Sequence, residues 1–267
     1  MRSMASSPSS KGIAAIVGVG PRLGLSIARK FAREGYTLAI LSSDLGRLSR
    51  FADEIARDEK ARVFAIRIDC SDTKSIREAF EGVLSLGFVE VLVYNAYHPM
   101  SWPPTNFADM RVQYFEKSIA VSSVGAFHCA QQVLPGMVDR GRGTILFTGC
   151  FASLNGIAGY SELCCGKFAL RALSQCLARE FQAQGVHVAH VIIDGYIGVP
   201  RNVINFTTKI KGGWGTTRAA AAAAAADWYR RRGRDYGPRR AGSNLLAIAH
   251  SRPIRLDPRD RPPSLKL

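Results

Sequence analysis

The stretch "IVGVGPRLGLSIA", residues 16–28, decides the fold, because an apolar run passes through closely spaced glycines into a helical pattern. The apolar run is typical of a buried strand that enters a turn. After the turn, Leu23, Ile27 and Phe31 recur at helical spacing, and Gly35 is placed to close this helix in the left-handed conformation. Glycines at a strand–helix junction let the backbone approach a pyrophosphate, whose charge the helix N-terminus favours. A tight turn without a ligand is the alternative.

The same alternation of apolar runs and helical patterns continues to residue 194. Strands are predicted at residues 12–20, 36–41, 61–69, 88–96, 143–149 and 186–194. Between them, helical spacing predicts two helices in residues 45–55 and 76–83 and two longer ones near 109–138 and 160–184. This order predicts an α/β fold with a doubly wound, parallel, Rossmann-like sheet in three α/β/α layers.

The glycines are spaced G-x-G-x-x-x-G at Gly18, Gly20 and Gly24. Together with the six strand–helix units, this spacing resembles the short-chain dehydrogenase/reductase family, whose loop reads T-G-x-x-x-G-[IL]-G. The resemblance covers residues 11–200, a predicted NAD(P)-binding domain. Leu23 keeps the aliphatic position, but Arg22 stands where the middle glycine belongs. Its side chain either clashes with a bound phosphate or grips it.

Further matches to the family follow in chain order. Asp69, at the end of the third predicted strand, corresponds to an aspartate that binds the adenine amino group, and Cys70 follows it. Asn95 and Ala96 keep two positions of the family's N-N-A-G. Ile197 lies where the family's backbone holds the nicotinamide carboxamide. For each residue alone, the alternative is a strand-end position that caps its neighbours.

The end of the second predicted strand bears on the choice of cofactor. An NAD enzyme places an acid at this strand tip to bind the ribose hydroxyls. Here Ser43 occupies the tip and Asp44 comes one residue late, so a 2′-phosphate is not repelled and Arg22, Ser42 and Ser43 can hydrogen-bond it. The resemblance therefore implies NADP(H) rather than NAD(H). The predicted cofactor contacts are Gly18, Gly20, Arg22, Leu23, Gly24, Ser43, Asp69, Cys70, Asn95, Ala96, Lys167 and Ile197.

The family's chemistry uses a Tyr that exchanges a proton, a Lys four residues later, a Ser that polarises the substrate oxygen and an Asn that holds a water. Lys167 is present, but Leu163 stands in the tyrosine position. Cys150 occupies the serine position and Ser122 the asparagine position. The chain therefore resembles a divergent member that lacks the catalytic Tyr. Lys167, Cys150 and Ser122 are its candidate catalytic residues.

Leucine cannot donate a proton, and losing a general acid lowers the rate by about 10²–10⁴. Three neighbours are candidate substitutes. Tyr160 is seven residues before Lys167, but we expect it to precede the helix, with Ser161 as the cap. Glu162 would point about 100° away from the tyrosine direction. Cys150 is a weak hydrogen-bond donor.

Two hypotheses follow from the resemblance. The first is an NADP(H)-dependent oxidoreductase that acts on a small-molecule carbonyl or secondary alcohol through an altered proton relay. The second is a catalytically inactive dinucleotide-binding or scaffold protein with the same fold. Family members pair through the two longer helices, which implies a homodimer or homotetramer in either case.

Basic charge is concentrated at the C-terminal end. Residues 201–267 carry 15 Lys and Arg against 4 Asp and Glu, or 15 − 4 = +11 of the total +15. This segment includes eight consecutive alanines and has no core pattern, so we predict a poorly ordered basic tail. Residues 1–10 are predicted to be a flexible, Ser-rich arm. Nucleic-acid binding by the tail is a third hypothesis, but no recognised module surrounds its aromatic residues, and we do not expect it.

The remaining composition points to a cytoplasmic protein. The six cysteines form no CxxC pair and no secretory leader precedes them, which indicates reduced thiols that mostly fill the core. No run reaches the roughly 18 apolar residues of a membrane span. No metal site is indicated.

Overall fold

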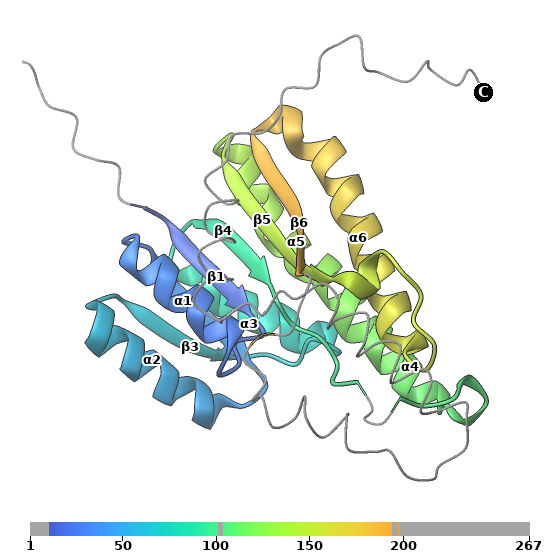
Figure 1. The fold of residues 1–267 in the computed structure, drawn as a ribbon. Helices are drawn as coiled ribbons and strands as arrows, with labels where there is room; N and C mark the ends of the chain where they lie inside the picture. The colour runs from blue at the N-terminus through green and yellow to red at the C-terminus, as the bar shows by residue number, and fades with distance from the viewer. Residues whose placement is uncertain (1–10, 101–103, 194–196, 198–267) are drawn as a thin grey trace, which may run out of the picture.

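The computed structural model of the chain describes residues 11–100, 104–193 and 197 (Figure 1). Its centre is a single sheet of six parallel strands in the order β3-β2-β1-β4-β5-β6. The strands are β1 (Ile13–Val17), β2 (Thr37–Ser42), β3 (Val63–Arg67), β4 (Val89–Tyr94), β5 (Gly143–Cys150) and β6 (Val186–Ile193). All six predicted strands are present, and the doubly wound topology is confirmed.

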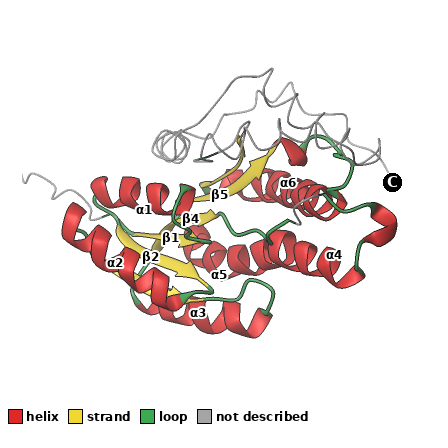
Figure 2. Ribbon diagram, turned by 60° about the horizontal axis from the view of Figure 1, so that its bottom comes forward, coloured by secondary structure: helices red, strands yellow, loops and turns green. Residues whose placement is uncertain are grey.

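In the described part of the chain, six α-helices connect the strands (Figure 2). They are α1 (Leu23–Arg33), α2 (Leu45–Glu59), α3 (Thr73–Ser85), α4 (Val112–Ile119), α5 (Gly125–Asp139) and α6 (Ser161–Phe181). The helix predicted near 109–138 is present as α4 and α5, which a π-helical turn over Ala120–Val124 joins. It begins at Val112 because a 3₁₀ turn at Phe107–Asp109 and an extended Met110 precede it.

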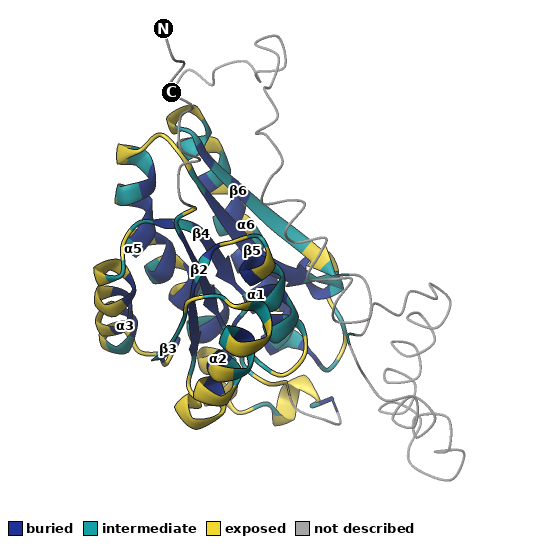
Figure 3. Cartoon of the chain, turned by 90° about the vertical axis from the view of Figure 1, so that its left-hand side faces the viewer, coloured by how far each residue is buried: buried dark blue, intermediate teal, exposed yellow. Residues whose placement is uncertain are grey.

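The four middle strands of the sheet are buried between two helical layers, whereas the edge strands β3 and β6 are mostly half-buried (Figure 3). Ala14 and Ile16 of β1 pack with α1 and α2, whereas Ala15 and Val17 pack with α3, α5 and α6. Every residue of β1 is buried, which is why this strand is an unbroken apolar run in the sequence. The three-layer α/β/α arrangement is therefore confirmed.

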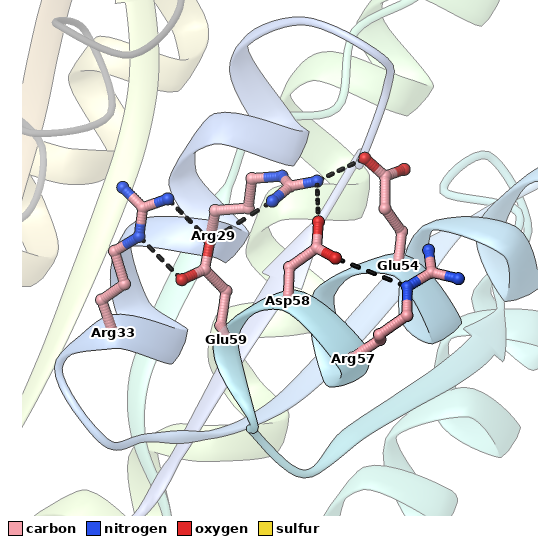
Figure 4. A network of polar contacts seen from close by, with 6 residues as sticks. All are labelled: Arg29, Arg33, Glu54, Arg57, Asp58 and Glu59. Atoms are coloured by element: carbon pink, nitrogen blue, oxygen red, sulfur yellow. Dashed lines mark hydrogen bonds and ion pairs between the residues drawn. The ribbon is translucent and has the colours of Figure 1, made fainter.

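Helix α1 is fixed at its C-terminal end and along its exposed side. Gly35 has φ +84, and the next residue, Tyr36, donates from its N–H to Phe31 O at 3.2 Å, so the predicted left-handed cap is confirmed. Arg29 contacts Glu54, Asp58 and Glu59 of α2 (Figure 4). These ion pairs tie the middle of α1 to the C-terminal end of α2.

Several predictions from the sequence fall outside the described residues, namely the arm at 1–10 and the tail at 201–267. Within the described residues, no helix is long and apolar enough to cross a membrane. The prediction that the cysteines mostly fill the core is wrong for half of them. Cys70, Cys129 and Cys164 are buried, but Cys150 is half-buried and both Cys165 and Cys176 are exposed.

Candidate active site

The glycine loop after β1 is held between the ends of two neighbouring strands. Gly18 N–H donates to Leu41 O of β2 at 2.8 Å. On the other side, Asn95 donates from its backbone N–H to Val17 O at 2.8 Å and from Nδ2 to Gly18 O at 2.9 Å. The loop therefore lies where β1 and β4 diverge, at the switch point of the sheet. Ligands of open α/β sheets bind in the crevice at this point.

The three loop glycines have different surroundings. A Cβ on Gly18, which has φ +86, would lie 2.5 Å from Ala96 N, and one on Gly24 would lie 2.7 Å from Val19 Cα. Both positions therefore need glycine for the chain to pack on itself. A Cβ on Gly20 would meet no atom within 4 Å. The space beside Gly20 and the positive N-terminal end of α1 fit a dinucleotide phosphate.

Arg22 and Leu23 start α1. Arg22 occupies the N-cap position and is exposed, and its carbonyl accepts the N–H of Ser26 at 3.1 Å. Its guanidinium makes no hydrogen bond or ion pair with any residue that the structure describes. Leu23 is half-buried and packs against the core under α1. The guanidinium of Arg22 is therefore available to an anion at the loop.

Ser43 is exposed at the tip of β2, and the next residue, Asp44, caps α2. The Asp44 carboxylate accepts the N–H of Arg47 at 3.0 Å and pairs with its guanidinium at 2.6 Å, which caps α2. The backbone N–H and the guanidinium of Arg47 hold the pKa of Asp44 below its usual value. The only acid near the strand tip in the sequence thus serves the helix.

The other predicted cofactor contacts lie at strand ends, with different exposure. Asp69 is exposed, and its carboxylate accepts both the hydroxyl and the N–H of Ser71, which lower its pKa. Cys70 is buried, and burial raises its pKa to about 11. Ala96 is buried beneath Gly18, whereas Ile197 is half-buried in an isolated β-bridge.

The three candidate catalytic residues come together around the first turns of α6. Lys167 is 5% exposed, and its Nζ donates to Thr148 O of β5 at 2.9 Å. Burial lowers the pKa of Lys167, and the nearby Cys150 thiol acts in the opposite direction. Ser122 lies in the π turn with a buried, unpartnered hydroxyl within the described chain. Gly166 permits this approach, because a Cβ there would lie 2.9 Å from Ser122 Cβ.

No proton donor occupies the tyrosine position. Leu163 packs on a small cluster formed by Ala152, Tyr160 and Cys164. Our prediction that Ser161 caps the helix is wrong. Tyr160 is the N-cap residue, and its carbonyl accepts the N–H of Cys164 at 2.9 Å.

Glu162 is buried rather than directed to solvent. It is 4% exposed, and neither carboxyl oxygen has a hydrogen-bond partner among the described residues. Its carbonyl accepts the hydroxyl of Ser118, so Glu162 lies against α4.

A family model described as short chain dehydrogenase matches residues 12–203. The chain belongs to the short-chain dehydrogenase family. Members of the family bind an NAD(P) dinucleotide and are oxidoreductases of alcohols and carbonyls. The family assignment that the sequence resemblance implies is therefore confirmed.

Two curated relatives of this short-chain dehydrogenase are 27% identical to it. A 3-ketodihydrosphingosine reductase from Bos taurus matches over 181 residues, which are 65% of this chain and 53% of that protein. The chain thus spans about half the length of the bovine protein. A 2,5-dichloro-2,5-cyclohexadiene-1,4-diol dehydrogenase from Sphingobium indicum matches over 202 residues, 70% of this chain and 74% of that protein.

Solved structures show the same fold. A short-chain dehydrogenase from Rhodopseudomonas palustris is 25% identical with a TM-score of 0.64, and the match covers 85% of this chain and 96% of that one. L-Sorbose reductase from Gluconobacter frateurii, complexed with NADPH and L-sorbose, is 23% identical with a TM-score of 0.77, covering 90% of each chain.

His190 of β6 lies beside the candidate catalytic residues, and the sequence reasoning missed it. Its ring occupies the space that a side chain at Gly149 would fill, and both ring nitrogens are buried without a partner in the described chain. Burial lowers the pKa of His190 to about 4, and the charges of Lys167 and Arg171 act in the same direction. The alternation of Val186, Val188 and His190 along the strand was the available signal.

Proposed function

We propose that this short-chain dehydrogenase is an NADP(H)-dependent oxidoreductase acting on a small-molecule carbonyl or secondary alcohol. The proposal rests on the arrangement of the site. The glycine loop lies at the switch point of the sheet with empty space beside Gly20, and the buried Lys167 lies near Cys150. Among the described residues, the Lys167 ammonium has one hydrogen bond and no carboxylate partner, and burying such a charge is costly for a fold. Contact between this ammonium and a bound ligand would explain why the charge is buried there.

The groups around the loop fit NADP(H) better than NAD(H). Arg22 and Ser43 are exposed and can donate to a 2′-phosphate, while the Asp44 carboxylate is paired with the Arg47 guanidinium. Asn95 and Ala96 would line the path of the dinucleotide toward Lys167. When bound, a nicotinamide supplies or accepts a hydride at the substrate carbon.

Without the tyrosine, the residues around the nicotinamide position would have to transfer the proton of the substrate oxygen. Cys150 takes the place from which the substrate oxygen is polarised, although a thiol donates weakly. Burial makes Lys167 release its proton more readily than an exposed lysine. Ser122 takes the position of the family's asparagine, and its hydroxyl, which has no partner among the described residues, would hold a water. We infer a water-dependent and slow proton route.

A second function is favoured by Leu163 itself. Without a proton donor in that position, the chain would bind the dinucleotide and work by association. A relative at 29% identity over 175 residues, from Xanthobacter autotrophicus, is named inactive 2-(S)-hydroxypropyl-CoM dehydrogenase 2.

We further propose that two copies of the chain pair through α5 and α6. Val124 and Phe127 expose 45% and 43% of their surface, and with Ser123 and Leu173 they line an apolar depression between the two helices. Apolar patches of this kind mark association surfaces. Sedimentation of the purified chain at several concentrations tests the pairing. A monomer at every concentration would contradict it.

The decisive test uses Leu163→Tyr with Leu163→Phe as its matched control. NADPH and NADH are first titrated into each protein, and each is then assayed with NADPH on a panel of ketones and aldehydes. The tyrosine should raise turnover by about 10²–10⁴, whereas the phenylalanine, which lacks the hydroxyl, should not. Nucleotide binding without turnover in Leu163→Tyr would favour the second function. Failure to bind either nucleotide would remove the oxidoreductase proposal.

A further inference from the structure

Two sulfur atoms at the site are held by the same loop. Cys150 ends β5, and its Sγ accepts the backbone N–H of Ser153. Cys164 lies in the first turn of α6, and its Sγ accepts the backbone N–H of Ile157 at 3.3 Å. The connection from β5 to α6 therefore fixes both thiols.

The two thiols also share one small apolar cluster. Cys164 belongs to it together with Ala152 and Tyr160, and Cys150 packs against it. The thiols lie within electrostatic range of each other. Cys150 is half-buried and therefore accessible to a small solute, whereas Cys164 is buried.

The other cysteines do not offer such a pair. Cys70 and Cys129 also lie near each other, but Cys129 is fully buried in the main core and cannot meet an oxidant from solution. Cys165 and Cys176 are exposed, and neither belongs to the apolar cluster of Cys164. A reachable thiol with a second thiol near it is the arrangement that responds to oxidation.

We propose that Cys150 and Cys164 form a hydroperoxide-sensitive thiol pair that closes to a disulfide. The Cys150 sulfur attacks one peroxide oxygen, the O–O bond breaks, and a sulfenic acid forms with release of water or an alcohol. The Cys164 sulfur then attacks the Cys150 sulfur, the S–O bond breaks, and water leaves. The two thiols lose two hydrogens in total, and one hydroperoxide is reduced.

Closure would change the site because of where the two residues lie. The bond would tie the end of β5 to the first turn of α6, and Cys150 would lose its S–H group. If the proposed function holds, turnover stops until the disulfide is reduced. The thiol chemistry itself does not depend on that function.

The experiment uses the full-length chain, hydrogen peroxide and peptide mass spectrometry after free thiols are blocked with N-ethylmaleimide. The wild type should yield a peptide pair joined through Cys150 and Cys164 that dithiothreitol separates. Cys165→Ser, which changes the exposed neighbour, should yield the same pair. Cys164→Ser should yield none, and dimedone should then label Cys150. Cys164→Ala is a second variant in case the serine misfolds.

Several results would overturn the proposal. These are full alkylation of Cys150 after peroxide, a sulfenic acid that never closes in the wild type, or a disulfide through other cysteines. Burial raises the pKa of Cys164, so closure should accelerate as the pH rises above neutral. The disulfide is detected by mass spectrometry and not by enzyme activity. The result can therefore be interpreted even if the chain binds neither nucleotide.

Discussion

Replacing Gly18 with alanine should break the loop that the site is built on. A Cβ there would lie 2.5 Å from Ala96 N, 2.6 Å from Ala96 Cα and 2.8 Å from Asn95 C. These are backbone atoms, so no side-chain rotation relieves the overlap. Overpacking costs about 1–3 kcal/mol, and a left-handed residue other than glycine costs about 1–2 kcal/mol. Gly18→Ala should therefore lose about 2–5 kcal/mol, a large share of the roughly 5–15 kcal/mol of a folded domain.

Gly20→Ala is the matched control, because a Cβ there meets no atom within 4 Å. Its free energy of unfolding should stay within about 0.5 kcal/mol of the wild type, while its affinity for NADPH should fall. Urea unfolding followed by circular dichroism measures the first quantity, and a fluorescence titration with NADPH measures the second. The reasoning would be refuted if Gly18→Ala unfolded at the same urea concentration as the wild type. It would also be refuted if Gly18→Ala and Gly20→Ala lost the same free energy of unfolding.

Three further changes test the cofactor site and its surroundings. Ser43→Asp places an acid at the strand tip, so the preference for NADPH over NADH should fall about tenfold or more; an unchanged ratio of dissociation constants would contradict the assigned subsite. The pKa of His190 is about 4 in the folded chain, against an ordinary value of 6.5. Between pH 6.5 and pH 4 the unfolded chain therefore binds more protons than the folded chain, and the free energy of unfolding falls as the pH drops. The loss is at most about 2 kcal/mol after solvent screening. His190→Asn should flatten that slope in urea midpoints measured from pH 7 to 4; an unaltered slope would count against it. Lys167→Met should keep or gain about 1 kcal/mol of stability, because a buried ammonium is removed, and should lose NADPH binding; a strongly destabilised variant that still binds would reverse this argument.

The order and type of the elements were predictable because the sheet is parallel. Strands buried on both faces are continuous apolar runs, and β1 and β4 are of this kind. The π turn at Ala120–Val124 was not predictable, since one extra residue per turn barely changes a helical apolar pattern. The start of α4 also depends on a 3₁₀ turn that no spacing indicates.

Some features of the candidate site were likewise predictable from the sequence, and others depend on contacts that the sequence does not reveal. The need for glycine at position 18 follows from a strand–helix turn and was visible in the sequence. The cap of α6 was not, because the Ser161 hydroxyl contacts Met110 Sδ at 3.4 Å rather than the helix amides. His190 was missed because a strand pattern specifies its face and not its neighbours. That Cys150 and Cys164 share a cluster depends on the fold of the β5–α6 connection.

Lys167 and Leu163 support different conclusions about the same helix. Leucine in the tyrosine position stabilises the apolar cluster of Tyr160 and Cys164, so the fold alone accounts for it. The fold gives no such account of Lys167, whose buried ammonium has a single carbonyl partner among the described residues. Departures from good packing concentrate where a protein meets a ligand. Leu163 therefore argues against the usual proton donor only, while Lys167 supports the proposal that the chain binds a dinucleotide.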